Sequence, residues 1–121
     1  MRDIDEKIYE ILDEIKEIDN VYKRLPGDFV VEENDNFVIF REESNLPVKF
    51  SDGDELGTEI IYNIDIYSKE PDTHIIRSKI NKELKKINMI RITGGGEEKD
   101  EELYVRNMMF IGFFNNHHYE K

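Results

Sequence analysis

The stretch Glu59-Ile-Ile-Tyr-Asn-Ile-Asp-Ile-Tyr-Ser-Lys-Glu70 alternates in hydrophobicity. One set of alternate positions is wholly apolar, namely Ile60, Tyr62, Ile64 and Ile66. Period two with β-branched and aromatic residues predicts a half-buried strand. Pro71-Asp72 ends this strand, and a helix capped by Asp72 or Thr73 is expected next. Its buried stripe consists of Ile76, Ile80, Leu84 and Ile87.

The same reading extends to both ends of the chain. An amphipathic helix is predicted from Ile4 to Ile18, with Asp3 and Glu6 as its capping box and Asn20 as its terminator. Strands are expected at residues 37–42, 89–93 and 103–114. Residues 44–58 are expected to form a long connection, residues 94–102 a flexible charged turn and residues 115–121 a mobile polar tail.

These elements follow in the order α-β-β-α-β-β, within a single domain of residues 1–121. Such an order predicts a two-layer α+β fold, in which two helices pack on one face of a mainly antiparallel sheet. In the last strand, Met109, Ile111 and Phe113 share one face, and Met108, Phe110 and Phe114 share the other.

The composition is strongly acidic, with a formal net charge of −11. Such a charge disfavours nucleic-acid binding, because duplex binding relies on Lys and Arg that displace counterions. The chain contains no cysteine, which excludes disulfides and thiolate sites. Its charged N-terminus does not resemble a signal peptide, and no apolar run reaches membrane-spanning length. A soluble cytoplasmic protein is therefore expected.

One pattern imitates a catalytic motif. Pro71-Asp72 followed by Glu83-Leu84-Lys85 resembles the carboxylates and lysine of metal-dependent nucleases, which hold Mg²⁺ beside an attacking water. In those enzymes the last three residues lie on a strand, whereas here Leu84 belongs to a helical stripe. Glu83 and Lys85 would diverge on either side of it, so solvated helix charges are the favoured interpretation.

Other candidate sites are also better explained by ordinary structure. The acidic segments at residues 52–55 and 97–102 lack the spacing of calcium loops. Residues Gly94–Gly96 are followed by acids, which would repel a phosphate. His117 and His118 are adjacent, so one face cannot present both to a metal, and His74 has no partners for a catalytic triad. No catalytic, metal-binding or cofactor-binding residue is predicted, and the chain is not expected to be an enzyme.

Charge contrast instead suggests a protein interface. The first helix is acidic on its outer side, while the second carries Arg77, Lys79, Lys82 and Lys86, so the two could meet across a repeated contact between subunits. An ordinary solvated helix face remains the alternative. Two acidic segments are further candidate contact arms, through Asp52, Asp54 and Glu55 in one and Glu97, Glu98 and Asp100 in the other.

The order of elements resembles the tail terminator (tail completion) proteins of long-tailed bacteriophages and of related prophage or tailocin particles. The resemblance rests on a helix followed by Phe37-Val-Ile-Phe-Arg41, Asn45-Leu-Pro47 and Ile64-Asp-Ile-Tyr-Ser68. A further helix and the aromatic strand Met108-Met-Phe-Ile-Gly-Phe-Phe114 complete it. It covers most of the chain, and the extreme net charge departs from the family.

The resemblance implies a non-enzymatic ring, commonly hexameric, that caps the tail tube and docks the head-side connector. DNA would pass through an acidic lumen without specific binding. The isolated subunit could be a monomer, and its location would be the bacterial cytoplasm during assembly and then the tail of the particle. Two alternatives stay open: another head-tail neck (head-completion) protein, and an acidic inhibitor that mimics DNA.

Overall fold

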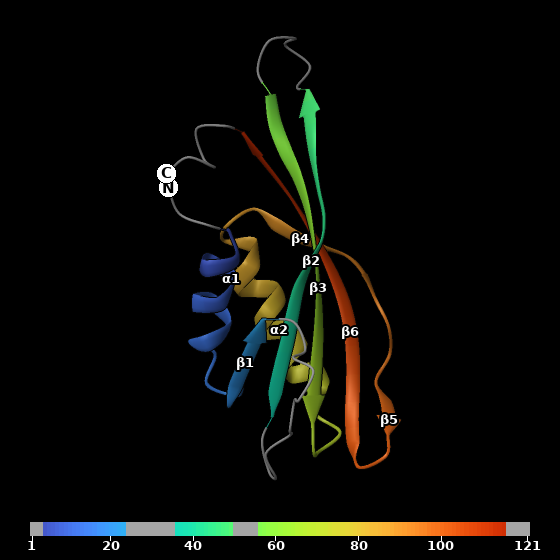
Figure 1. Ribbon diagram of the computed structural model, residues 1–121. Coiled ribbons are helices and arrows are strands. Elements are labelled where there is room, and N and C mark those ends of the chain that lie inside the picture. Colours follow the sequence, from blue (N-terminus) through green and yellow to red (C-terminus); the bar gives the residue numbers. More distant parts are fainter. Residues whose placement is uncertain (1–3, 24–35, 50–55, 116–121) are drawn as a thin grey trace.

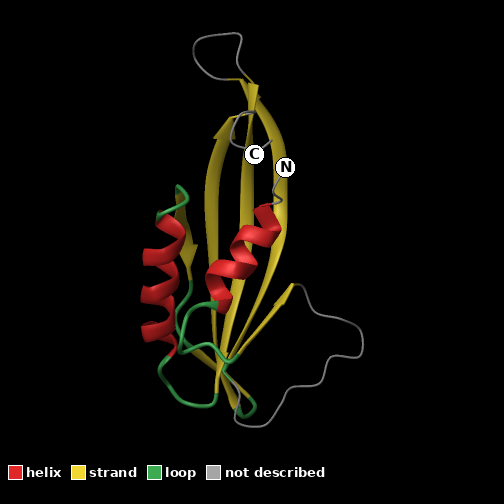
Figure 2. Cartoon of the chain, turned by 90° about the vertical axis from the view of Figure 1, so that its left-hand side faces the viewer, coloured by secondary structure: helices red, strands yellow, loops and turns green. Residues whose placement is uncertain are grey.

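The computed structural model describes residues 4–23, 36–49 and 56–115 of the chain. Their elements are α1 (Ile4–Asp13), β1 (Asn20–Lys23), β2 (Phe37–Lys49), β3 (Leu56–Ser68), α2 (Thr73–Lys85), β4 (Met89–Gly94), β5 (Glu98–Asp100) and β6 (Leu103–Asn115). Both helices lie on the same side of one sheet (Figure 1), and Figure 2 shows this helix layer in front of the strands. The predicted α+β class with two layers is confirmed, but the predicted order lacks two strands.

The sheet has the strand order β1-β2-β3-β6-β4, and β5 also pairs with β6. All pairs are antiparallel except β1 with β2, which is parallel. Strand β3 contains the alternating stretch quoted at the start. It lies at the centre of the sheet, between β2 and β6. The ends of β2 and β3 extend past the helices as a long arm (Figure 1).

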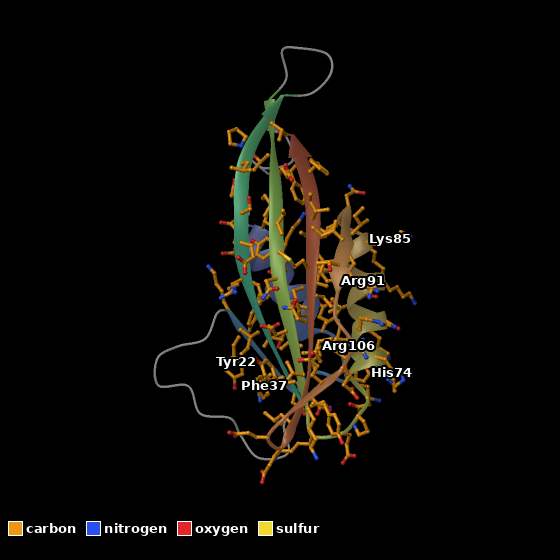
Figure 3. The ribbon with its side chains drawn as sticks, turned by 90° about the vertical axis from the view of Figure 1, so that its right-hand side faces the viewer. Tyr22, Phe37, His74, Lys85, Arg91 and Arg106 are labelled. Carbon is orange, nitrogen blue, oxygen red and sulfur yellow. The ribbon has the colours of Figure 1, made fainter. Side chains whose placement is uncertain are left out.

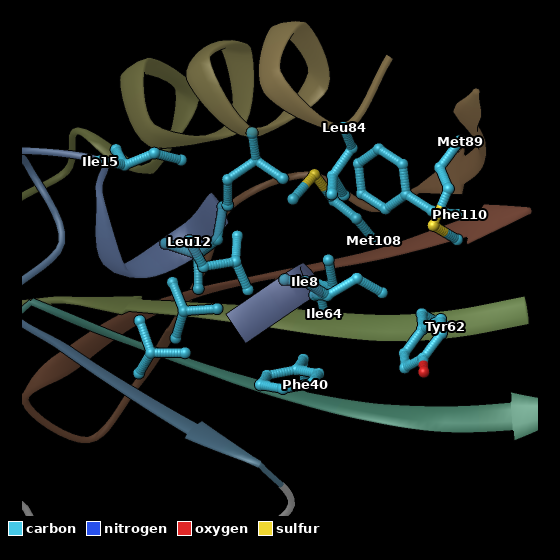
Figure 4. Close-up of a cluster of buried hydrophobic side chains, with 14 of the residues drawn as sticks. Ile8, Leu12, Ile15, Phe40, Tyr62, Ile64, Leu84, Met89, Met108 and Phe110 are labelled. Carbon is cyan, nitrogen blue, oxygen red and sulfur yellow. The ribbon is translucent and has the colours of Figure 1, made fainter. Parts of the chain in front are cut away.

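The core lies between the helices and the sheet. The predicted inward set of β3 is buried, and it meets Val38, Phe40, Met108 and Phe110 from the neighbouring strands. Helix α1 contributes Ile8 and Leu12, and α2 contributes Ile76, Ile80 and Leu84. Figure 4 shows Leu84, Met89, Met108 and Phe110 gathered below α2. The two predicted helical stripes are therefore the surfaces that cover the sheet.

The first helix is shorter than predicted. It ends at Asp13, although Ile15 and Ile18 remain buried in the turns that follow. The chain is held in these turns by Asp19, whose carboxylate accepts from the backbone N–H of Asn36 at 2.8 Å. Asn20 is thus the first residue of β1 and not the helix terminator, and Asp3 lies outside the described residues.

Two predicted loops are largely strand. Residues 44–49 continue β2 and residues 56–58 begin β3, so the expected connection of residues 44–58 shrinks to residues 50–55, which lie outside the described part. Pro47 is compatible with β2 because, among the described strands, β1 pairs with β2 only as far as Phe40. Residues 98–100, expected in a charged turn, form β5.

The N-terminus of α2 is capped differently from the prediction. Asp72 occupies the cap position but makes no capping bond, and its carboxylate instead accepts from the Ser68 hydroxyl at 2.7 Å. The carboxylate of Glu97 takes the capping role by accepting from Thr73 N at 3.1 Å and from the Thr73 hydroxyl. A negative group is favoured there by the exposed N–H groups and the helix dipole.

The Glu97 carboxylate also interacts electrostatically with Arg106, which lies near Arg77. Burial and the neighbouring Arg77 guanidinium lower the pKa of Arg106, and the Glu97 carboxylate opposes this change. Arg106 donates from Nε to the Thr73 hydroxyl at 3.1 Å, so it joins the same network. The guanidinium remains charged, because arginine is not deprotonated in proteins.

Removing this cap should be measurable. Glu97→Ala is expected to lower the free energy of unfolding by about 1–2 kcal/mol, since it leaves the first N–H of α2 without this acceptor and removes the carboxylate that favours the charged form of Arg106. Chemical denaturation of Glu98→Ala is the matched control, because the neighbouring Glu98 is exposed. Equal losses in the two variants would contradict the capping role.

Candidate functional site: the open face of the sheet

The side of the sheet opposite the helices is called here the open face, and Figure 3 views it. Alternation places Glu59, Ile61, Asn63, Asp65 and Tyr67 of β3 on this side, since their neighbours point into the core. Strand pairing then aligns residues of adjacent strands into rows across the face. No described helix covers these rows.

Aromatic contacts close the end of the open face beside β1. The Phe37 ring stacks on Tyr67 with 4.6 Å between ring centroids and meets the edge of Tyr22 at 6.0 Å. These two neighbours leave Phe37 buried although it lies outside the helix-sheet core. This end is therefore packed by its own side chains.

The middle of the open face is polar. Asn107 of β6 donates from Nδ2 to Asn63 Oδ1 at 2.7 Å and to Asp65 Oδ1 at 2.6 Å. A shallow hollow of about 130 Å³ lies beside them, lined by Ile39, Arg41, Asn63, Asp65 and Tyr67. The hydrogen bonds between strands explain how Asn63 can be buried. The hollow is too small for an ordinary ligand pocket.

Beyond the polar middle, the open face is apolar and exposed. One row contains Ile61, Ile111 and Ile90, which pair across β3, β6 and β4. The next row contains Leu46, Glu59 and Phe113. The relative exposure is 54% for Ile90, 54% for Leu46 and 52% for Phe113. Contiguous large apolar side chains in such positions are typical of protein interaction surfaces.

The predicted basic residues of α2 lie elsewhere, on the helix side, and two of them are engaged within the chain. Lys79 pairs with Glu17 at 2.6 Å, and Lys86 pairs with Glu83 at 3.1 Å. Arg77 is half-buried. Lys82 and Lys79 line a cleft of about 290 Å³ between α2 and residues 11–17. Opposite charges of the two helix segments are thus paired, in part, within one subunit.

The Lys79 bond gives a pH prediction. Donation from Lys79 Nζ lowers the pKa of Glu17 below its ordinary value of 4.5. A carboxylate whose pKa is lower in the folded than in the unfolded state stabilises the fold at pH values above its unfolded-state pKa. This stabilisation is lost as the pH falls through the folded-state pKa. Lys79→Met should therefore raise the pKa of Glu17 and flatten the loss of stability below pH 4.5.

An NMR titration of the Glu17 carboxyl carbon measures this change directly. The control is Lys82→Met, which removes a lysine from the same cleft but not the bond to Glu17. A Glu17 pKa that stays low in Lys79→Met would refute the assignment.

The predicted acidic contact residues lie only in part within the described residues. Asp52, Asp54 and Glu55 lie outside the described residues. Glu97 is occupied at the start of α2, and the backbone of Asp100 lies in β5.

Glu98 pairs with Val105 at a corner of the open face, so Glu98 does not form one patch with the basic residues of α2.

Within the described parts of the chain, no group of three His, Asp or Glu side chains is placed to hold a metal ion. Asp72, from the nuclease-like motif, binds Ser68, and Glu83 lies on α2 beside Lys86. The predicted helix around Leu84 is confirmed. His117 and His118 lie outside the described residues. Neither described helix is long and apolar enough to cross a membrane.

The apolar rows of the open face were not singled out from the sequence, although a signal for them was present. Strand β6 carries large apolar side chains on both faces, and the sequence predicts both helices on one face of the sheet. The second apolar set, which includes Ile111 and Phe113, would then lie on the face without a predicted helix. A scan against protein-family models found no match for the chain, and a search of curated proteins also found none.

Proposed function

We propose that this chain is a structural assembly subunit of the phage tail-terminator kind, which acts through its surfaces and not by catalysis. The observation that carries the proposal is the open face, where Ile90, Leu46 and Phe113 are each about half exposed on a chain with a net charge of −11. A highly charged chain with a contiguous apolar sheet face is suited to bind another protein there.

Two further features support this kind of subunit. The arm of β2 and β3 projects beyond the helix layer and offers a surface that can reach a neighbouring molecule (Figure 1). The acidic outer side of α1 suits a particle through which DNA must pass, because like charges prevent counterion-driven adsorption. In this proposal the subunits form a ring, commonly hexameric in the family, that caps the tail tube and receives the head-side connector.

The test uses the tail tube protein of a long-tailed phage or tailocin. Polymerising tubes are mixed with the protein, and tube lengths are measured by negative-stain electron microscopy. Capping should shorten the length distribution and place extra density at one tube end. Tubes of unchanged length without end density would overturn the proposal.

Binding measured to the tube, to the head-side connector and to a basic DNA-processing enzyme separates the alternatives. Binding to the connector but not to tubes would identify a head-completion protein of the neck. A protein that binds neither, but forms a tight complex with a basic DNA-processing enzyme, would be a DNA mimic, and its binding would weaken steeply with salt.

A further inference from the structure

The apolar row formed by Ile61, Ile111 and Ile90 separates two rows of different chemistry on the open face. On one side lies the row with Glu59, flanked by Leu46 and Phe113. On the other side lies the row with Arg41 and Asn63, followed by Met109 and Thr93. Each is one same-face step from the apolar row, roughly 6.6 Å along the strands.

This arrangement is self-complementary. A two-fold axis along the apolar row exchanges the two flanking rows, so Glu59 of one copy faces Asn63 of the other and lies beside its Arg41. Phe113 of each copy faces Met109 of the other, a favourable contact between sulfur and an aromatic ring. We propose that a second copy of this chain covers the open face by sheet-on-sheet packing about this axis, with every contact made twice.

The available area fits such a pair. Strands β2, β3 and β6 each have 13 residues and run for about 40 Å, and the six-residue β4 adds a shorter fourth strand, which together give roughly 700 Å² at ordinary strand spacings. Stable protein interfaces bury about 800 Å² on each partner.

Charge also favours this face for self-association. A net charge of −11 opposes contact between two copies over most of the surface. In the four described rows at residues 59–65 of β3, the open face carries Arg41, Glu59 and Asp65, and together with Glu43, which pairs with Arg41, these groups hold only a small part of the net negative charge. Arg41 is exposed and pairs with Glu43 at 2.8 Å, which leaves its remaining donors available to Glu59 of the second copy.

This two-fold pair is a property of the free protein and goes beyond the proposed function, because a ring that caps a tube needs head-to-tail contacts. The mass of the full chain is measured by sedimentation equilibrium over micromolar to sub-millimolar concentrations. The wild type should pass from monomer to dimer. Glu59→Lys and Arg41→Glu should each raise the dimer dissociation constant at least about tenfold, since each places like charges together at two symmetric positions.

The double variant Glu59→Lys/Arg41→Glu should restore dimerisation to near the wild-type value, because it exchanges the two charges. Matched controls are Asp13→Lys on α1 and Lys85→Glu on α2, which make the same charge changes at exposed positions of the helix layer. They should leave the dissociation constant nearly unchanged. Glu59→Lys lowers the net negative charge, so general repulsion alone would predict tighter association, the opposite of the expected result.

Circular dichroism confirms that each variant is folded. A wild type that stays monomeric over the whole range would overturn the pair, and so would single variants that dimerise normally or a double variant that does not recover. The tube-length assay measures capping independently of the mass of the free protein, so failure of the pair and failure of the proposed function remain distinguishable.

Discussion

Phe110→Ala should lower the free energy of unfolding by about 3–5 kcal/mol, the range for truncating a buried aromatic side chain. Phe110 has a relative exposure of 0% and belongs to the core between the sheet and α2. Figure 4 shows its ring beside Met89 and Met108, with Leu84 above. Truncation removes the contacts of the ring and leaves a cavity that these neighbours can fill only in part. Urea denaturation, followed by circular dichroism, measures the loss.

The same strand supplies the control. Phe113 lies three residues further along β6 on the open face and is half exposed, so Phe113→Ala should change monomer stability by less than about 1 kcal/mol. Both variants are measured at a concentration at which the wild type is monomeric, so that dimerisation does not contribute. A comparable loss at the two positions would contradict the assignment of β6 faces and the two-layer architecture with it.

The regular elements could be predicted because their periodicity is strong. Strand β3 alternates without interruption and α2 repeats its isoleucines at helical spacing, so local pattern and tertiary burial agree. The predicted faces of β6 are likewise confirmed, since Met108 and Phe110 are buried and Phe113 is exposed. In these segments the local sequence pattern is sufficient to assign which residues share a face.

The missed elements depend on contacts between distant residues. Strand β1 has four residues and exists as a strand through its parallel pairing with β2, which a local pattern does not reveal. Strand β5 has three residues, all of them charged, and is held by β6 across a short turn. The predicted first helix was too long because the buried side chains of Ile15 and Ile18 match a helical stripe even though they lie in turns.

The candidate site was the least predictable feature. Charged residues were expected to mark the interface, yet Lys79, Lys86 and Glu97 have partners within the chain. Sequence shows which residues carry charge but not whether a neighbouring element neutralises it. The apolar row with Ile61, Ile90 and Ile111 requires strand pairing to become visible, because its members are separated in sequence and meet only through register.

Gly112→Ala should destabilise the protein by about 1–3 kcal/mol through overpacking. Gly112 is buried in β6 opposite Met89 of β4. A Cβ atom there would lie 2.7 Å from Phe114 Cε2, closer than these atoms can approach, and 3.0 Å from Met89 Cγ, which is a tight contact. The Phe114 ring covers the glycine and is itself only 6% exposed, so it has little room to move away. The aromatic side chain thus fills the space that a glycine leaves in a strand.

Gly96→Ala is the matched control, because a Cβ atom at that position meets nothing within 4 Å. Its free energy of unfolding should stay within about 0.5 kcal/mol of the wild type. The double variant Gly112→Ala/Phe114→Leu should lose less stability than the sum of its two single variants, since the smaller side chain makes room for the added methyl group. Strict additivity would mean that Gly112 is required for a reason other than its contact with Phe114. A neutral Gly112→Ala would contradict the overpacking, because it would show that the Phe114 ring can move away from the added methyl group.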